Sequence, residues 1–532
     1  MPHSISPESS APQSEEHTMD DVEQNGDNAA QITPEEPHAD AKPAEEAEDD
    51  DNDVAMAESE TDVNTVAENP IKPEVKLEDL FADFESDDEF PESSSKDIKV
   101  TSSPQEPASP VHIGPTSRAS DPEVMRSFYQ RLFPWRQLFQ WLNHSPTPST
   151  DFGHREFAFT LQNDAYLRYQ SFPSADLLRK DVLRLMPSRF EIGPVYSTNP
   201  RDRKTLRKST AFKPIAKELC FDIDLTDYDE IRTCCDKANI CNKCWQFITM
   251  AIKVVDVALR DDFGFKHIMW VYSGRRGAHA WVCDKKARQM DDQKRRAIAG
   301  YLELIRGGAQ TAKKVNVKRP LHPHVSRSLD ILKGHFQNDI LHDQDPWEDE
   351  EKIDKLLQLL PDRTLNDSLR KKWSASPGRS STSKWADIDA LAKTTKGLDT
   401  KALLEAKQDI VLEYTYPRLD IEVSKKLNHL LKSPFVVHPG TGRVCVPIDT
   451  RHLEDFDPLA VPTVTELLGE IDQWTSTEDG EKEAKSIQDW EKTSLKPFVD
   501  YFRSFVAALI RDEKDIKVKR ERDNANADSM VF

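Results

Sequence analysis

Apolar positions along residues 122–532 follow two periods, one typical of helices and one typical of strands. A spacing of three and four residues predicts helices at 128–142 (with a break at Pro134), 179–186, 245–259, 284–305 and 498–509. Alternation of apolar and polar residues predicts strands at 156–161, 166–172, 218–225, 268–272, 279–282 and 418–423. The strands and helices intermix without the regular alternation of a doubly wound sheet, so the pattern favours an α+β fold.

The same patterns divide the chain into five segments. Residues 1–120 form a tail with few apolar residues, and residues 346–410 form an inserted helical lobe, with charged, helix-periodic sequence. The α+β core is expected in two parts, 121–345 and 411–470, followed by a C-terminal helical segment at 471–532.

The tail differs sharply in charge from the rest of the chain. Residues 1–120 contain 32 acidic and 6 basic side chains, whereas residues 121–532 contain 62 acidic and 66 basic ones. Such an acidic segment, without Trp or Cys, cannot bury enough apolar surface to offset chain entropy, so we expect it to be disordered. The net charge of −22 therefore belongs to the tail, and it does not exclude a nucleic-acid partner for the body.

One stretch of the tail, 75–90, carries Leu77, Leu80, Phe81 and Phe84 at helical spacing among acids. It is either a short helix that docks in a partner's groove or a chance apolar cluster. The chain contains no apolar run of 18 residues and begins without a secretory pattern, so we expect an intracellular protein with no membrane span.

Asp222 and Asp224 are the most informative pair of residues in the chain. In a strand their side chains turn to one face, while the apolar residues of 218–225 turn to the other. Two neighbouring carboxylates repel each other unless a cation lies between them, and Mg²⁺ or Mn²⁺ prefers such oxygen ligands. The pair predicts a metal site in an enzyme that acts on phosphates.

Asp420 is a candidate third carboxylate. If 418–423 is a strand beside the first one, Asp420 and Glu422 share its polar face, and Asp420 completes a site for two ions. The alternative is that Asp420 simply faces solvent.

Two further segments carry groups suited to phosphate. Residues 273–281 (SGRRGAHAW) combine two glycines, which permit a sharp turn, with Arg275, Arg276 and His279 as donors. Residues 432–442 (KSPFVVHPGTG) add Lys432 and His438. Taken alone, the first could be a plain hairpin with a basic tip and the second an ordinary loop.

Four cysteines gather within eleven residues, at Cys234, Cys235, Cys241 and Cys244. Four thiolates at this density fit a tetrahedral structural zinc, and the CxxC half has the spacing with which two sulfurs chelate one ion. Buried free thiols are the alternative. Because Trp245 begins an amphipathic helix, a bound ion would fix a loop to that helix.

These segments, read together, resemble the eukaryotic DNA primase small, catalytic subunit, a member of the archaeo-eukaryotic primase family. The likeness rests on 218–229 (ELCFDIDLTDYD), 234–245 (CCDKANICNKCW), 263–284 and 418–449, and it covers about residues 122–345 and 411–470. It implies a mixed catalytic core with an RRM-like sheet, an inserted helical subdomain and a structural zinc.

The resemblance also implies roles for individual residues. Asp222, Asp224 and Asp420 would hold two Mg²⁺ or Mn²⁺ ions, and the incoming nucleotide would meet Ser273, Arg275, Arg276, His279, Lys432 and His438. Further active-site positions of the family fall on Glu156, Tyr166 and Arg168. Arg189 and Glu191 stand where the family often has Lys and Asp, which keeps the charge but changes the reach.

The implied activity is a DNA-directed RNA polymerase that makes short primers from ribonucleoside triphosphates on single-stranded DNA. The implied partners are a primase large subunit and the catalytic and accessory subunits of DNA polymerase alpha, and the implied location is the nucleus. A two-metal nuclease or phosphatase would use the same aspartates, but it would leave the two basic segments without a triphosphate to hold. A non-catalytic scaffold is disfavoured because every carboxylate and phosphate-binding position is present.

Overall fold

The computed structural model describes residues 121–145, 147–206, 211–305, 314–315, 317–475 and 487–529. The chain divides into two units, Met1–Pro104 and Gln105–Phe532, and all described residues belong to the second. The tail predicted to be disordered at 1–120, with its apolar cluster at 75–90, lies outside the described residues. Within the described part of the chain, no helix is long and apolar enough to cross a membrane.

The second unit contains two antiparallel sheets, which confirms the α+β class. The first has the order β2-β1-β3-β4, with β8 also paired to β3. Its strands are β1 (Arg155–Thr160), β2 (Tyr166–Gln170), β3 (Arg189–Tyr196), β4 (Pro214–Ala216) and β8 (Leu431–Lys432). The second sheet, of order β5-β7-β6-β9, contains β5 (Leu219–Asp224), β6 (Ile268–Tyr272), β7 (Gly277–Val282) and β9 (Pro447–Ile448).

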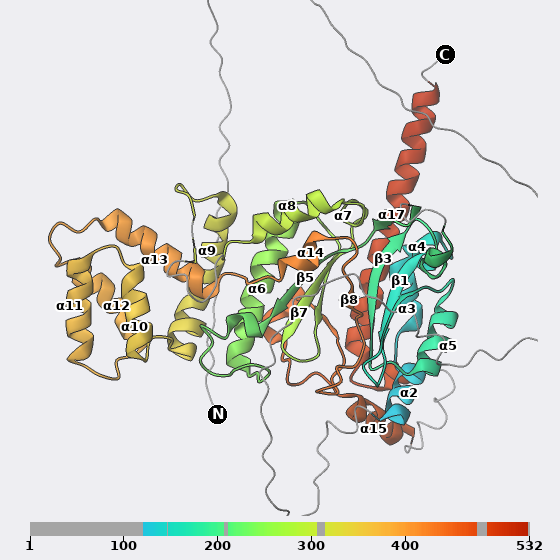
Figure 1. The fold of residues 1–532 in the computed structure, drawn as a ribbon, viewed down its shortest axis with the longest axis horizontal. Helices are drawn as coiled ribbons and strands as arrows, with labels where there is room; N and C mark the ends of the chain where they lie inside the picture. Colours follow the sequence, from blue (N-terminus) through green and yellow to red (C-terminus); the bar gives the residue numbers. More distant parts are fainter. Residues whose placement is uncertain are drawn as a thin grey trace, which may run out of the picture. The chain divides into compact units, whose positions relative to one another are not determined.

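Helices cover the two sheets. Figure 1 shows α6 beside β5 and β7, with α8 nearby, and α3 and α5 near β1. Helix α6 buries the apolar face of its amphipathic sequence, from Cys244 to Leu259. The helices outside the lobe are α2 (Pro122–Arg131), α3 (Trp135–Asn143), α4 (Thr150–Gly153), α5 (Ala175–Leu185), α6 (Asn242–Asp261), α7 (Lys285–Arg288), α8 (Asp292–Leu302), α9 (Pro323–His335), α14 (Ile421–Lys425), α15 (Val464–Thr475) and α17 (Lys496–Ser529).

The segment between the two halves of the core is helical. It contains α10 (Glu350–Leu359), α11 (Arg363–Ser374), α12 (Ser381–Ala392) and α13 (Thr400–Thr415), drawn in yellow to orange in Figure 1. Helix α9 leads to it through a π-helix, Phe336–Gln344, and α13 contacts both of these elements. A helical segment is therefore inserted before the chain returns to the core at Asp420.

Two sequence predictions need correction. Residues 418–423 are not a strand: Asp420 makes one isolated bridge to Asp222, and helix α14 then begins. The reason is local, because the Asp420 carboxylate accepts a hydrogen bond from the backbone N–H of Glu422 and caps the helix. Residues 284–305 form two helices, because Asp291 caps α8 and separates it from α7.

Candidate functional site

The pairing of β5 with β7 brings the first acidic and basic groups together. Asp222 lies opposite His279 and Asp224 opposite Gly277 in the antiparallel register. The Asp222 Oδ1 and His279 Nε2 atoms are 3.5 Å apart, and the Arg276 guanidinium donates to both oxygens of Asp224, at 2.8 and 2.9 Å. Sequence alternation thus predicted the correct face for both aspartates.

Asp420 reaches Asp222 by a backbone contact. Its N–H donates to the Asp222 carbonyl oxygen at 3.1 Å. Burial, and then the charges of Asp224 and Asp420, raise the pKa of Asp222 to about 7. The structure therefore brings the three predicted carboxylates together, although Glu422 turns away and pairs with Lys425.

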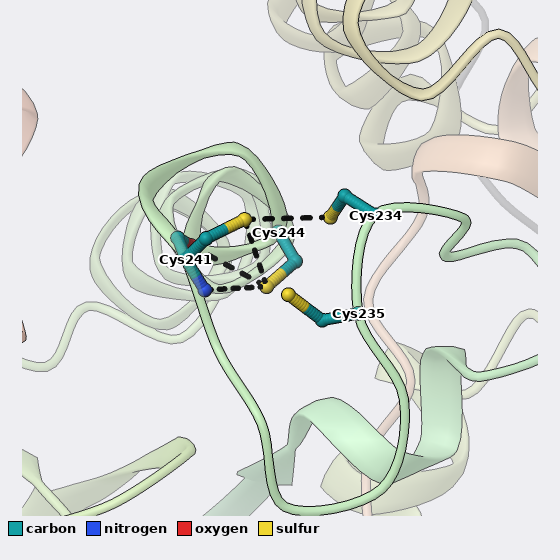
Figure 2. A group of neighbouring side chains, drawn as sticks. All are labelled: Cys234, Cys235, Cys241 and Cys244. Carbon is teal, nitrogen blue, oxygen red and sulfur yellow. Dashed lines mark hydrogen bonds between the residues drawn. The ribbon is translucent and has the colours of Figure 1, made fainter.

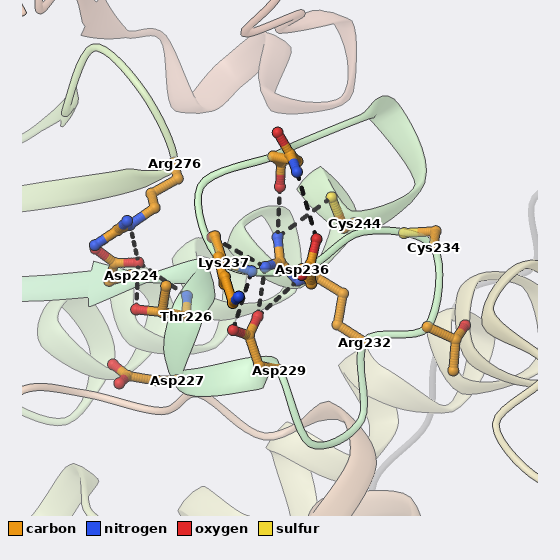
Figure 3. A network of polar contacts seen from close by, with 12 residues as sticks. Asp224, Thr226, Asp227, Asp229, Arg232, Cys234, Asp236, Lys237, Cys244 and Arg276 are labelled. Atoms are coloured by element: carbon orange, nitrogen blue, oxygen red, sulfur yellow. Dashed lines mark hydrogen bonds and ion pairs between the residues drawn. The ribbon is translucent and has the colours of Figure 1, made fainter. Parts of the chain in front are cut away.

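Asp227 is a fourth carboxylate that the sequence analysis did not assign. It lies in the short 3-10 helix Leu225–Tyr228 that follows β5, and Figure 3 shows it below Asp224 and Thr226. Burial and the charges of Asp224 and Asp420 raise its pKa to about 6. The sequence signal that could have identified Asp227 is its position within the acidic stretch 218–229. Carboxylates that raise one another's pKa in this way fit a bound divalent cation, for which oxygen atoms are the preferred ligands.

Two clefts share Asp222 and Asp224. The first, the acidic cleft, has a volume of about 430 Å³ and is also lined by Asp227, Glu303 and Asp420. The second, the basic cleft, has a volume of about 320 Å³. It gathers seven of the predicted nucleotide-binding residues: Arg189, Ser273, Arg275, Arg276, His279, Lys432 and His438.

Close packing fixes the loops around the basic cleft. The Lys432 ammonium donates to the Ser273 carbonyl oxygen at 3.2 Å. Gly274 has a φ of +87°, and a Cβ on it would lie 2.6 Å from the Cβ of His438. The SGRRG turn and the 432–442 loop therefore contact each other directly, and Gly274 is required where they meet.

Both histidines of the basic cleft are neutral at pH 7. Burial, together with the charge of Lys432, lowers the pKa of His279 to about 3. The same two causes, with Arg275 in addition, lower the pKa of His438 to about 3. Each imidazole can therefore donate one N–H, while the cations of the cleft are its arginines and Lys432.

Glu156, Tyr166 and Arg168 do not line the basic cleft. The Tyr166 hydroxyl donates to Glu191, which does line it, at 2.6 Å, so Tyr166 lies at the rim. Glu156 is fully buried and accepts hydrogen bonds from the Arg168 guanidinium and the Tyr196 hydroxyl. Glu156 therefore fixes the positions of neighbouring side chains and does not contact a ligand in the cleft.

The four predicted cysteines form one cluster, drawn in Figure 2. Their sulfur atoms all lie within 4.8 Å of one another, so the group could hold a metal ion. Cys241 caps α6 and Cys244 lies in its first turn, while Cys234 and Cys235 come from the preceding loop. A shared ion would join that loop to α6, as the sequence analysis predicts.

Two residues outside the motif donate to the sulfur atoms. The side-chain amide of Gln344, at the end of the π-helix, donates to Cys234 Sγ at 3.3 Å and accepts from the Thr233 N–H at 2.8 Å. The buried guanidinium of Arg232, held by Asp229, lies 3.8 Å from Cys244 Sγ. The sequence held no signal for Gln344, because it lies far from the cysteines along the chain.

Comparisons with known proteins agree with this geometry. A family profile described as "DNA primase small subunit" matches residues 221–450. The chain is 53% identical to the DNA primase small subunit of Schizosaccharomyces pombe over 77% of its own length and 94% of the relative. It is 45% identical to that of Saccharomyces cerevisiae (75% and 94%) and 37% identical to that of Drosophila melanogaster (78% and 97%). The chain therefore belongs to the DNA primase small subunit family.

Proposed function

We propose that this chain synthesises short RNA primers from ribonucleoside triphosphates on a single-stranded DNA template. Membership of the family makes it a primase-type nucleotidyltransferase of DNA replication. The observation that carries the finer proposal is the basic cleft, in which the aspartate pair and the two phosphate-binding segments face one space. A triphosphate there would have its charged groups beside Arg275, Arg276 and Lys432.

Asp222, Asp224 and Asp420 would hold two Mg²⁺ or Mn²⁺ ions. Ions bound in such a site lower the pKa of the attacking 3′-hydroxyl and offset charge on the leaving pyrophosphate. The two arginines would orient the triphosphate and counter charge that develops on it. Ser273, His279 and His438 would donate further hydrogen bonds, and Arg189 would close the cleft on the side of β3.

The proposal extends to the second metal, the partners and the location. The cysteine cluster would hold a structural Zn²⁺, because four thiolates without an open position favour that ion. A small subunit works with other subunits, and we propose the primase large subunit and the catalytic and accessory subunits of DNA polymerase alpha as partners, in the nucleus. We also propose that the sheet of order β5-β7-β6-β9 is the RRM-like sheet of the family.

A nuclease or phosphatase built on the same aspartates is the competing function. It would explain the acidic cleft, but it requires no cluster of three arginines and a lysine on the other side of Asp222 and Asp224. The basic cleft therefore favours a reaction in which a triphosphate is held and pyrophosphate leaves.

Incubation of the full chain with a poly-dT template, ATP and Mn²⁺ tests the proposal. We expect oligoribonucleotide products, and we expect Asp222→Asn with Asp224→Asn to reduce their yield more than 100-fold. Glu350→Gln with Glu351→Gln, two exposed changes on α10, is the control for loss of two carboxylates. Shortening of the template without any product would favour the nuclease instead.

A further inference from the structure

A group of exposed basic and half-buried aromatic side chains lies on and next to β2, beyond the rim of the basic cleft. We call it the Tyr169 ledge, and it consists of Tyr169, Arg203, Lys204, Phe212 and Lys213. Arg203 and Lys204 lie in the 3-10 helix Pro200–Thr205, which contacts β2. None of these residues has a role in the nucleotide site described above.

Stacking organises the ledge. The Arg203 guanidinium carbon lies 3.8 Å from the centre of the Tyr169 ring, and that of Arg168 lies 4.8 Å from the same ring. Phe212 packs edge-on against Tyr169 at 6.0 Å and stacks in parallel on Tyr196 at 4.0 Å. When a guanidinium stacks on an aromatic ring, its N–H groups point outward in the guanidinium plane. They can therefore still donate hydrogen bonds to a ligand.

The charge of the ledge is largely uncompensated. Within the described part of the chain, no carboxylate forms an ion pair with Arg203, Lys204 or Lys213, and all three side chains are exposed. Arg168 differs, because the buried Glu156 pairs with it at 3.0 Å. The ledge therefore presents Arg203 on an aromatic face, with the exposed lysines Lys204 and Lys213 next to Arg203 and Phe212 in the chain. Such a combination suits the phosphates of a nucleic acid strand.

The backbone of Tyr169 is held in an unusual conformation to present this ring. Its φ of 60° is in the left-handed region, which a bulky residue rarely adopts. The Glu156 carboxylate accepts the Tyr169 N–H at 3.0 Å and thereby fixes this conformation. One buried carboxylate thus orients Arg168, Tyr169 and Tyr196 together.

The ledge lies close to the rim of the basic cleft, along the same strand. Tyr166, at the rim, and Tyr169 belong to the same strand and are three residues apart, which is at most about 10 Å of strand. A stacked nucleic acid strand advances about 3.4 Å per nucleotide, so this separation corresponds to no more than about three nucleotides.

We propose that the Tyr169 ledge binds the phosphate backbone of a nucleic acid strand within a few nucleotides of the rim of the basic cleft. This inference rests on the proposed primase function. Arg203, Lys204 and Lys213 would contact phosphates without reading sequence, while Tyr169 holds Arg203 in place. Contacts of this kind hold a strand in register at the active site, and they weaken as salt increases.

Fluorescence anisotropy with labelled oligo-dT annealed to a short RNA primer, at several salt concentrations, tests the ledge in the full chain. We expect Arg203→Gln with Lys204→Gln to lower the slope of log K against log salt by about 1.4, from about 0.7 for each of two phosphate contacts. Lys393→Gln with Lys396→Gln, exposed lysines in the turn between α12 and α13, removes the same charge and should leave the slope unchanged. An equal loss in both variants, or in neither, would overturn the proposal.

A second arm identifies the strand. If the ledge holds the template, the Arg203/Lys204 variant weakens binding of oligo-dT alone and of oligo-dT annealed to a short RNA primer. If it holds the primer, only the primed substrate is affected. Primer synthesis by the unaltered chain is scored separately, so failure of the ledge and failure of the primase function are distinguishable.

Discussion

The backbone N–H of Asp420 donates to the carbonyl oxygen of Asp222 at 3.1 Å, and this single antiparallel bridge joins the two halves of the carboxylate group. The contact uses main-chain atoms, so it does not depend on the charge of either side chain. The position of Asp420 can therefore be tested separately from its chemistry.

We predict that Asp420→Asn retains the fold and loses the activity. Asn caps a helix as well as Asp does, so α14 should keep its start, and the melting temperature should stay within about 2 °C. Primer synthesis should decrease at least 100-fold, because a neutral amide binds a divalent cation more weakly than a carboxylate and offsets none of its charge. Asp420→Ala should in addition cost about 1 kcal/mol of unfolding free energy, from loss of the cap. Full activity in the Asn variant would remove Asp420 from the metal site.

Gln344→Ala should weaken metal binding at the cysteine cluster. The change removes the hydrogen bond to Cys234 Sγ and leaves the Thr233 N–H without its acceptor. Loss of such outer contacts typically reduces metal affinity about 10- to 100-fold. Competition with a chromophoric chelator measures this, and thermal melting should fall in parallel. Gln293→Ala, an exposed change on α8, provides the control.

Stability should decrease in acid because of Glu218. Burial alone would raise its pKa, but the charge of Arg155 and a hydrogen bond from His144 hold the pKa well below the ordinary 4.5. A carboxyl with a lowered pKa in the folded state contributes stability above its unfolded pKa and loses it as the pH falls toward the folded value. Melting temperature should therefore decline below about pH 4.5.

Glu218→Gln is the variant that tests this assignment. It should flatten the decline in acid and lower stability by about 3–5 kcal/mol at pH 7, because Arg155 is then buried without its partner. An unchanged profile of melting temperature against pH would place the acid sensitivity elsewhere in the chain.

Gly274→Ala should impair nucleotide binding. The new methyl group would collide with His438 where the two loops of the basic cleft meet, and the φ of +87° disfavours any residue other than glycine. We expect the KM for ATP to increase more than tenfold. Gly300→Ala, in the open on helix α8, has the same change in size and should be neutral or slightly stabilising.

Local patterns predicted the parts of the site that lie within one strand or one turn. Alternation placed Asp222 and Asp224 on the correct face, and the spacing of Cys241 and Cys244 predicted that their sulfur atoms lie close together. The pattern failed at Asp420, because a three-residue alternation also fits a helix cap, and only the partner strand decides between them. It could not find Gln344, which approaches the cysteines through a π-helix that has no sequence signature.

The insertion of helices α10–α13 between the two parts of the core has a consequence for synthesis of the protein itself. A nascent chain that has emerged through α6 already displays Asp222 and Asp224 as well as all four cysteines. The residue that completes the carboxylate group emerges only after the whole lobe. The four cysteines are therefore available to a metal ion early, when α6 forms, whereas the carboxylate group is complete only after translation has passed Asp420.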